Sequence, residues 1–232
     1  MSPMFAELPD ESLRSDHARI TVLGGTGYTG AAVVTEAAKR GHDVTSVSRT
    51  EPISRIDGVD YVIGSVADGN VLDTVLPGRD VVFSALSPRG DMAGKLEGLV
   101  DTLIVRLAGT STRLGYTGGA SSLRAEAGGP TLWELSKDDL PTELKPEIET
   151  GIKVYSTLQT SPESLDWFYV SPPADFGSWL DTPSKGTYVI GGDVLLRDAA
   201  GESTISAADL AIAVVDEIET PNHHRARFTA IH

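Results

Sequence analysis

The chain has 232 residues, of which 19 are Lys or Arg and 33 are Asp or Glu, and it contains no cysteine. The resulting net charge of −14 repels phosphate backbones, so we expect no nucleic-acid partner. Without cysteine there are no disulfides, thiolate metal sites or thiol nucleophiles, which favours a cytoplasmic protein. The apolar share of 40% is typical of a chain with a buried core.

The first 18 residues are polar, and they lack the basic start and apolar run of a signal peptide. Elsewhere the apolar runs are far shorter than the roughly 20 residues that span a bilayer, so we expect no membrane association. The sequence therefore predicts a polar N-terminal tail over 1–18 and a single domain over 19–232. It does not predict the oligomeric state.

The first half of the chain alternates β-branched or apolar runs with segments rich in helix formers. The first strand, helix and second strand together form a βαβ unit of about 30 residues. The predicted strands are 20–23, 44–48, 61–63, 80–85 and 113–117. The predicted helices between them are 31–40, 71–76 and 96–107.

In the second half, prolines break the segment 128–146, and the pattern then resumes. Strands that alternate with helices imply a doubly wound α/β domain with a mostly parallel sheet, because parallel neighbours need a helical crossover. The last part, from about 175 to 232, is predicted to add a small hairpin-helix extension on the substrate side. Its predicted elements, with the helix and strand before them, are helix 148–159, strand 165–171, hairpin 188–196 with 203–205, helix 206–219 and strand 227–231.

Two overlapping glycine spacings follow the first predicted strand: Gly25-x-Gly27-x-x-Gly30 and Gly24-x-x-Gly27-x-x-Gly30. A dinucleotide pyrophosphate takes hydrogen bonds from main-chain amides at a helix N-terminus, and a Cβ at the contact would block it. Gly30 also lets the helix lie close to the strand. Because the loop joins a strand to a helix at the start of a βαβ unit, it predicts nucleotide binding rather than an ordinary tight turn.

The second predicted strand ends in Ser48-Arg49-Thr50, where an NAD-selective site has a carboxylate about 20 residues after the glycines. Arg49 suits the 2′-phosphate of NADP(H), and a solvated arginine at a loop edge is the alternative. Glu51 lies close by in sequence and weakens the inference. NADP(H) is therefore the favoured cofactor, with NAD(H) as the alternative.

Several stretches resemble the atypical short-chain dehydrogenase/reductase proteins. Later motifs resemble, more narrowly, the NmrA-like and NADH-flavin reductase-like bacterial proteins, which are similar to mammalian flavin/biliverdin reductase. The broader resemblance rests on residues 22–30, Ser48-Arg49 and Phe83-Ser84-Ala85-Leu86-Ser87. The narrower one rests on Gly118-Gly119-Ala120-Ser121-Ser122-Leu123, Asp166-Trp167, Val170-Ser171-Pro172-Pro173 and Gly191-Gly192-Asp193.

The resemblance covers nearly all of the chain from 20 to 228, and it implies an NADP(H)-binding Rossmann fold. It places Ser65 and Val66 at the adenine, and Ser121 and Pro172 beside the nicotinamide. Relatives have Asp where this chain has Ser65, which removes an acceptor for the adenine amino group. The remaining cofactor contacts that it implies are Gly24, Thr26, Gly27, Tyr28, Thr29, Arg49, Ala85, Leu86 and Ser87.

Carbonyl reduction in short-chain dehydrogenases uses a Tyr as general acid and a Lys one helical turn later. Tyr155 lies on the predicted helix where this pair belongs, but Gln159 takes the place of the Lys, and the other five tyrosines also lack the partner. Its apolar neighbours favour a core tyrosine. Lys153 is a candidate that faces the cleft, with a surface lysine as the alternative. Ser121 positions the acceptor or a water, or else satisfies backbone groups.

Other kinds of site have less support. The pair His223-His224 has no carboxylate at ligand spacing on a shared element, so we expect no metal. No serine has an evident His partner and no Gly-x-Ser-x-Gly elbow occurs, which disfavours a serine hydrolase.

The missing Tyr-Lys pair disfavours carbonyl reduction and favours a reaction that needs no general acid from the protein. Hydride transfer to a flavin needs only stacking on the nicotinamide, because protons come from water and the cofactor carries the chemistry. We therefore expect an oxidoreductase, NADPH-dependent by preference, with a small flavin-like or quinone-like acceptor. The alternative is a non-catalytic, redox-sensing regulator that binds NAD(P). An epimerase or dehydratase is disfavoured by the same missing pair. The sequence does not identify the acceptor, nor does it say whether 124–146 forms a lid.

Overall fold

The computed structural model describes residues 17–89 and 92–232, so the predicted polar tail lies almost entirely outside the described residues. Within the described part of the chain, no helix is long and apolar enough to cross a membrane.

Eight strands form one sheet in which all neighbours are parallel except the last pair. The strands are β1 (Arg19–Leu23), β2 (Asp43–Ser48), β3 (Val59–Ile63), β4 (Val81–Ser84), β5 (Arg113–Thr117), β6 (Trp167–Ser171), β7 (Val189–Gly191) and β8 (Ala226–Ile231). Their order across the sheet is β3-β2-β1-β4-β5-β6-β8-β7. The winding reverses between β1 and β4, which is the point where doubly wound sheets bind ligands.

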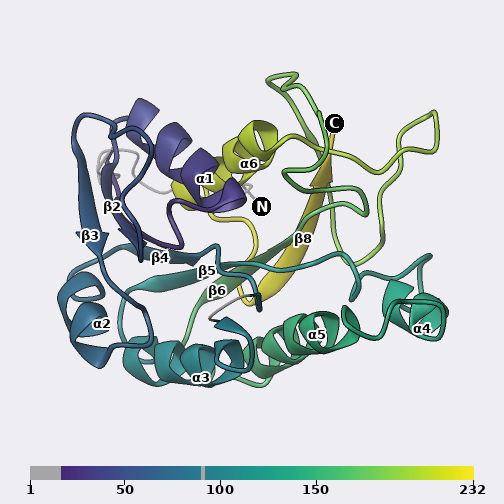
Figure 1. Cartoon of the computed structure of the whole chain (residues 1–232), viewed down its shortest axis with the longest axis horizontal. Coiled ribbons are helices and arrows are strands. Elements are labelled where there is room, and N and C mark those ends of the chain that lie inside the picture. Colours follow the sequence, from purple (N-terminus) through teal and green to yellow (C-terminus); the bar gives the residue numbers. More distant parts are fainter. Residues whose placement is uncertain (1–16, 90–91) are drawn as a thin grey trace, which may run out of the picture.

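Helices cover both faces of this sheet, as Figure 1 shows. One face packs against α1 (Tyr28–Lys39) and α6 (Ala207–Glu219), and the other against α2 (Gly69–Val75), α3 (Leu96–Leu107) and α5 (Lys145–Gln159). The short helix α4 (Leu132–Ser136) lies beyond α5 at one end of the molecule (Figure 1). The predicted doubly wound α/β fold is confirmed.

The strand β5 contains Gly115-Tyr116, an unusual pair for a buried strand that has a packing explanation. A Cβ at position 115 would lie 2.4 Å from a ring carbon of Phe168 and 2.6 Å from one of Phe83. These two rings, from the strands on either side, stack with centroids 6.0 Å apart. On the opposite face Tyr116 stacks on Tyr169 at 5.8 Å. Glycine is therefore the residue that allows two large rings to meet above β5.

The C-terminal region differs from the predicted hairpin. The segment 188–196 forms only the short strand β7, which pairs antiparallel with β8 and not with 203–205. Thr204 instead forms a bridge with Asp175. The predicted tight turn is present, because the Gly201 N–H donates to the Asp198 carbonyl at 3.0 Å. The turn is therefore local, but the two segments that it joins have other partners: β7 pairs with β8 in the sheet, and Thr204 forms an isolated bridge with Asp175.

The segment before β6 also differs from the prediction. The segment 128–146 contains α4, whose N-cap Thr131 and third helical residue Glu134 form a capping box. Helix α5 begins before the predicted residue 148, with Pro146 in its first turn, where the missing N–H of proline costs no helical hydrogen bond.

The C-terminus is fixed through a buried carboxylate at the start of α6. Ser206 is the N-cap and accepts a hydrogen bond from the Asp209 N–H at 3.0 Å. The fully buried Asp209 side chain accepts hydrogen bonds from the Ser184 hydroxyl and from the backbone N–H groups of Lys185 and Gly186. It also contacts His232 at 2.6 Å. Burial favours the neutral acid, but these hydrogen bonds outweigh it and lower the pKa of Asp209 to about 2.

Candidate cofactor site

The glycine turn after β1 is shaped mainly by the protein itself. Gly24 has φ +86°, and its N–H and that of Gly25 both donate to the Val47 carbonyl, at 2.8 and 3.1 Å. A Cβ on Gly25 would lie 2.2 Å from Ser46 Oγ, and one on Gly30 would lie 2.1 Å from the Gly24 carbonyl oxygen. These three glycines are therefore required by the turn and by the close approach of α1, as the sequence predicts for Gly30.

Gly27 differs from the other three glycines. It is the N-cap of α1 with φ −76° and ψ 171°, and a Cβ there would meet only the Gly24 carbonyl oxygen, at 3.3 Å. No side chain caps α1 and its first turn has no acidic residue. Side chains cap α2, α4 and α6, and the uncapped helices α3 and α5 have a glutamate in the first turn, so α1 is the one described helix with neither. The first N–H groups of α1 and the positive end of its dipole therefore suit an anion, as a dinucleotide pyrophosphate requires.

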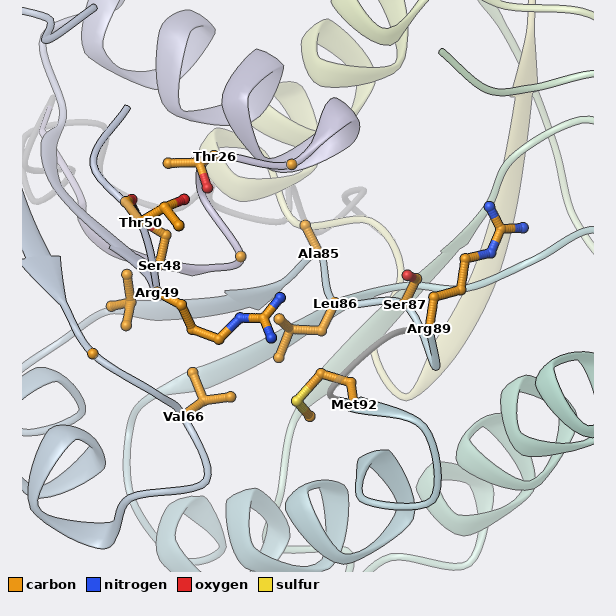
Figure 2. A pocket seen from close by; sticks show the side chains of 14 residues that line it. Thr26, Ser48, Arg49, Thr50, Val66, Ala85, Leu86, Ser87, Arg89 and Met92 are labelled. Atoms are coloured by element: carbon orange, nitrogen blue, oxygen red, sulfur yellow. Dashed lines mark hydrogen bonds between the residues drawn. The ribbon is translucent and has the colours of Figure 1, made fainter. Parts of the chain in front are cut away.

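A cleft of about 230 Å³ opens beside this turn, at the switch point between β1 and β4. Figure 2 shows the side chains that surround it, from the ends of β1, β2 and β4 and from the loop after β3. The residues that line it are Gly24, Thr26, Gly27, Val47, Ser48, Arg49, Thr50, Gly64, Val66, Ala85, Leu86, Ser87, Arg89 and Met92.

The cleft is positive although the chain is strongly acidic. Of its 14 described lining residues, two are arginines and none is acidic. The side chain of Arg49 extends from the end of β2 into the cleft toward Leu86 (Figure 2). The nearby acid Glu51 pairs with Arg55 at 2.7 Å and does not line the cleft. The groups present therefore fit a phosphorylated dinucleotide, because the helix N-terminus and Arg49 can bind two different phosphate groups of the same molecule.

The structure brings together the predicted residues that lie directly after strand ends. Among those predicted to contact the cofactor, the ones in the cleft lining are Gly24, Thr26, Gly27, Arg49, Val66, Ala85, Leu86 and Ser87. The others are outside this lining: Tyr28, Thr29, Gly30, Ser65 and Pro172.

Each residue outside the lining has a structural environment of its own. The Tyr28 ring packs on Phe176, with centroids 5.2 Å apart, and Thr29 is buried in α1. The Ser65 hydroxyl accepts from the Ala67 N–H at 3.2 Å in the turn after β3. Pro172 is buried directly after β6. Their contacts with a cofactor stay predictions.

Sequence reasoning missed six residues of the lining. Most lie at the carboxyl ends of parallel strands, which meet at one edge of the sheet, so the strand assignment alone was a signal for them. Arg89 and Met92 come from the loop between β4 and α3, whose path the sequence pattern does not define. The missed residues are Val47, Ser48, Thr50, Gly64, Arg89 and Met92.

The two catalytic candidates are not part of the cleft lining. Lys153 is exposed on α5 and lies 3.5 Å from the Glu97 carboxylate on α3. The Ser121 carbonyl accepts from the Trp133 N–H at 2.8 Å, and this residue is only half-buried. Both environments match the surface and structural alternatives, and a catalytic role for either residue stays a prediction.

Tyr155 lacks the electrostatic environment of a general acid. Its half-buried ring packs against Tyr169 and Trp167, with centroids 4.8 and 6.4 Å away. Burial raises the pKa of Tyr155, and the guanidinium of Arg227, 4.4 Å above the ring, offsets only part of this. The pKa of such an acid needs to be lowered toward the working pH, so this environment matches the alternative of a core tyrosine.

The adjacent histidines each contact a different carboxylate. His223 Nδ1 lies 2.6 Å from Glu217, which is also paired with the buried Arg113, and His224 Nδ1 lies 2.9 Å from Asp166. Among the described residues, no group of three or more His, Asp or Glu is placed to hold a metal ion.

Comparisons with known proteins agree with this geometry. The family model described as NAD(P)H-binding matches residues 24–221. YwnB of Bacillus subtilis is 31% identical over 215 residues, which are 92% of this chain and 98% of that protein. A solved Streptococcus pneumoniae protein, provisionally named an NADH-flavin reductase, is 31% identical with a TM-score of 0.82, covering 93% of this chain and 99% of its own.

A solved Bacteroides thetaiotaomicron protein, provisionally named an epimerase, is 29% identical with a TM-score of 0.77, covering 92% and 96% of the two chains. The names of these relatives differ, but the fold and the nucleotide-binding model agree over nearly the whole length. The family model covers most of the chain, from the glycine turn to just after α6, and the chain belongs to the NAD(P)H-binding family.

Proposed function

We propose that the protein is an NADP(H)-dependent oxidoreductase that passes a hydride to a flavin-like or quinone-like acceptor. The observation that carries this proposal is the cleft at the switch point. Arg49 and the uncapped N-terminus of α1 both border it, and its described lining contains no acidic side chain. The name of the Streptococcus pneumoniae relative supports the reaction class.

Arg49 supports NADP(H) over NAD(H). The NAD-selective arrangement places a carboxylate at the end of β2 to accept from the ribose 2′-hydroxyl. Here that position holds an arginine, and the next acid, Glu51, is engaged by Arg55. A guanidinium suits a 2′-phosphate because it offers charge and several N–H donors in one plane.

The lining also favours an acceptor that needs no general acid. When bound, a reduced nicotinamide supplies a hydride, and an oxidised flavin that receives it takes one proton from water, so that two electrons move. The described lining residues contain no His, Lys, Tyr, Asp or Glu. The chain's own part is therefore to bind, orient and partly desolvate the two rings.

Stopped-flow mixing of the protein and NADPH with FMN, riboflavin or a quinone tests the activity. Oxidation of NADPH well above the spontaneous rate is expected with at least one acceptor. If no acceptor is reduced faster than in buffer, the proposed activity is refuted.

The same lack of a proton donor in the lining favours one other function, a regulator that binds NADP(H) without turning it over. Calorimetry with NADP⁺ and NADPH separates the two. A redox sensor needs clearly different affinities for the two forms, whereas a reductase needs only binding and turnover.

The substitution Arg49→Glu tests the cofactor preference. Loss of a charge-assisted contact and addition of a repulsive charge should weaken NADPH binding by about 100-fold, with much less effect on NADH. Arg106→Glu is a matched control, because it makes the same change of charge at an exposed ion pair outside the cleft lining. Equal losses for both cofactors would show that Arg49 does not contact the 2′-phosphate.

A further inference from the structure

An exposed aromatic side chain stands beside the cleft. Trp179, in the segment after β6, is 68% exposed, which is unusual for a residue of this size. The guanidinium of the cleft residue Arg89 lies over its ring, 5.9 Å from the centroid. Three residues earlier, Phe176 packs on Tyr28 at the start of α1. The segment therefore runs from the cofactor helix to the loop after β4, along the side of the cleft.

The Trp179 ring is held in place although it is exposed. A Cβ at position 177 would lie 2.2 Å from two carbons of this ring, so the indole folds back over Gly177. A ring that is positioned before binding loses little conformational entropy when a planar molecule stacks on it. The exposed face of Trp179 is therefore suited to stacking.

Arg89 adds a positive charge next to this ring. Its side chain is 55% exposed, and its Nε donates to Glu147 on α5 at 2.6 Å. One carboxylate oxygen does not saturate a guanidinium, which has five N–H donors. Figure 2 shows Arg89 beside Ser87 and away from Arg49, so the two arginines of the lining serve different parts of the site.

We propose that Trp179 and Arg89 form the acceptor subsite, with the indole stacking on a planar heteroaromatic ring and the guanidinium binding an anionic substituent of the same molecule. The preferred acceptor class is therefore a phosphorylated flavin rather than an uncharged flavin or a quinone. As a statement about turnover this rests on the proposed function. As a statement about binding it stands on the two side chains and is tested separately.

Calorimetry with FMN and riboflavin as probes, on the full chain saturated with NADP⁺, tests the subsite. FMN should bind at least about tenfold more tightly than riboflavin, because only FMN offers a phosphate to Arg89. Arg89→Gln should reduce FMN affinity to that of riboflavin, and should leave riboflavin unchanged. Arg106→Gln is the matched control, since Arg106 also pairs with an exposed acid but lies outside the cleft lining.

The ring is tested with two further variants. Trp179→Ala should weaken both flavins by about tenfold or more, whereas Trp179→Phe should retain most of the binding, because a smaller ring still stacks. Melting temperatures of these exposed-site variants should stay close to that of the parent protein.

Three results would overturn the subsite: no binding of FMN, equal affinity for FMN and riboflavin in the parent protein, or unchanged affinities in Trp179→Ala. Normal turnover with an unaltered KM for FMN in both Arg89→Gln and Trp179→Ala would also overturn it, and would leave the proposed function standing. FMN binding as expected without any NADPH oxidation would refute the proposed function and support the subsite.

Discussion

Replacement of Gly27 by alanine should separate cofactor binding from folding. The nearest protein atom to the new Cβ is the Gly24 carbonyl oxygen at 3.3 Å, and the backbone is in an extended region open to alanine. Alanine is a poorer N-cap than glycine, so the cost in folding free energy is about 1 kcal/mol. At roughly 2–4 °C per kcal/mol for a chain of this size, the melting temperature should fall by only a few degrees.

Cofactor binding should fall far more in the same variant. A methyl group at the N-terminus of α1 would keep a pyrophosphate away from the first N–H groups of the helix. Each charge-assisted hydrogen bond contributes about 1.5–3 kcal/mol. Loss of one or two of them amounts to roughly 10–10⁴-fold in affinity for NADPH.

Gly30→Ala is the matched control for this experiment. Its Cβ would lie 2.1 Å from the Gly24 carbonyl oxygen, so we expect both binding and melting temperature to fall clearly. Calorimetric titration and thermal melts on the two variants give the comparison. NADPH affinity in Gly27→Ala within threefold of the parent would refute the assignment of the phosphate to the start of α1.

Three further predictions follow from packing, pH and chemistry. Gly115→Val should destabilise the fold by about 1–3 kcal/mol or more, because the Phe83 and Phe168 rings occupy the space of the new side chain. Gly119→Ala is the control and should not destabilise the fold, because the space around Gly119 is open. Thermal melts of the two variants test this prediction. The pKa of Asp209 is lowered from 3.8 to about 2, so its carboxylate stabilises the fold above pH 4 by roughly 2 kcal/mol, and this is lost as the pH falls toward 2. In urea titrations across this pH range, Asp209→Asn should show a weaker loss of stability than the parent. Tyr155→Phe should leave NADPH oxidation by FMN within about threefold, since a true general acid contributes at least 100-fold.

The part of the site that was predictable from the sequence is the part made by local pattern. The glycine turn, Arg49 and residues 85–87 follow strands that are recognisable as β-branched or apolar runs. Parallel strands bring their carboxyl ends to one edge, so these residues meet without knowledge of any tertiary contact. This explains why Arg49 and Ser87 both line the cleft.

What the sequence did not predict depends on segments that fold against distant partners. Arg89 lines the cleft from the loop after β4, and Trp179 lies beside Arg89 in the segment after β6, which packs on Tyr28 through Phe176. The predicted C-terminal hairpin was wrong for the same reason. β7 pairs with β8, and the segment near Thr204 forms only a single bridge, with Asp175. The turn between those segments is nevertheless present as predicted.

Gly115 and Gly27 show that one residue type carries two kinds of information. A Cβ at Gly115 would overlap rings of the protein itself, so that glycine reports on packing of the core. At Gly27 a Cβ would meet only one backbone oxygen, at 3.3 Å, so the fold needs glycine far less there and a bound ligand supplies a further reason for it. The sequence shows two glycines without this distinction, and only the distances around each position supply it.

The acidic surface and a phosphate-binding cleft are compatible because electrostatic forces act over different ranges. The net charge of −14 is spread over the chain, and at physiological salt its field is screened within about 8 Å. Contacts with Arg49 and with the N–H groups of α1 act at hydrogen-bond distance, where screening is weak. The described cleft lining contains two arginines and no acid, so the charged side chains of the lining itself are all positive. The net charge of the chain is therefore a poor predictor of whether this cleft binds an anion, and the charges of the residues that line it are a better one.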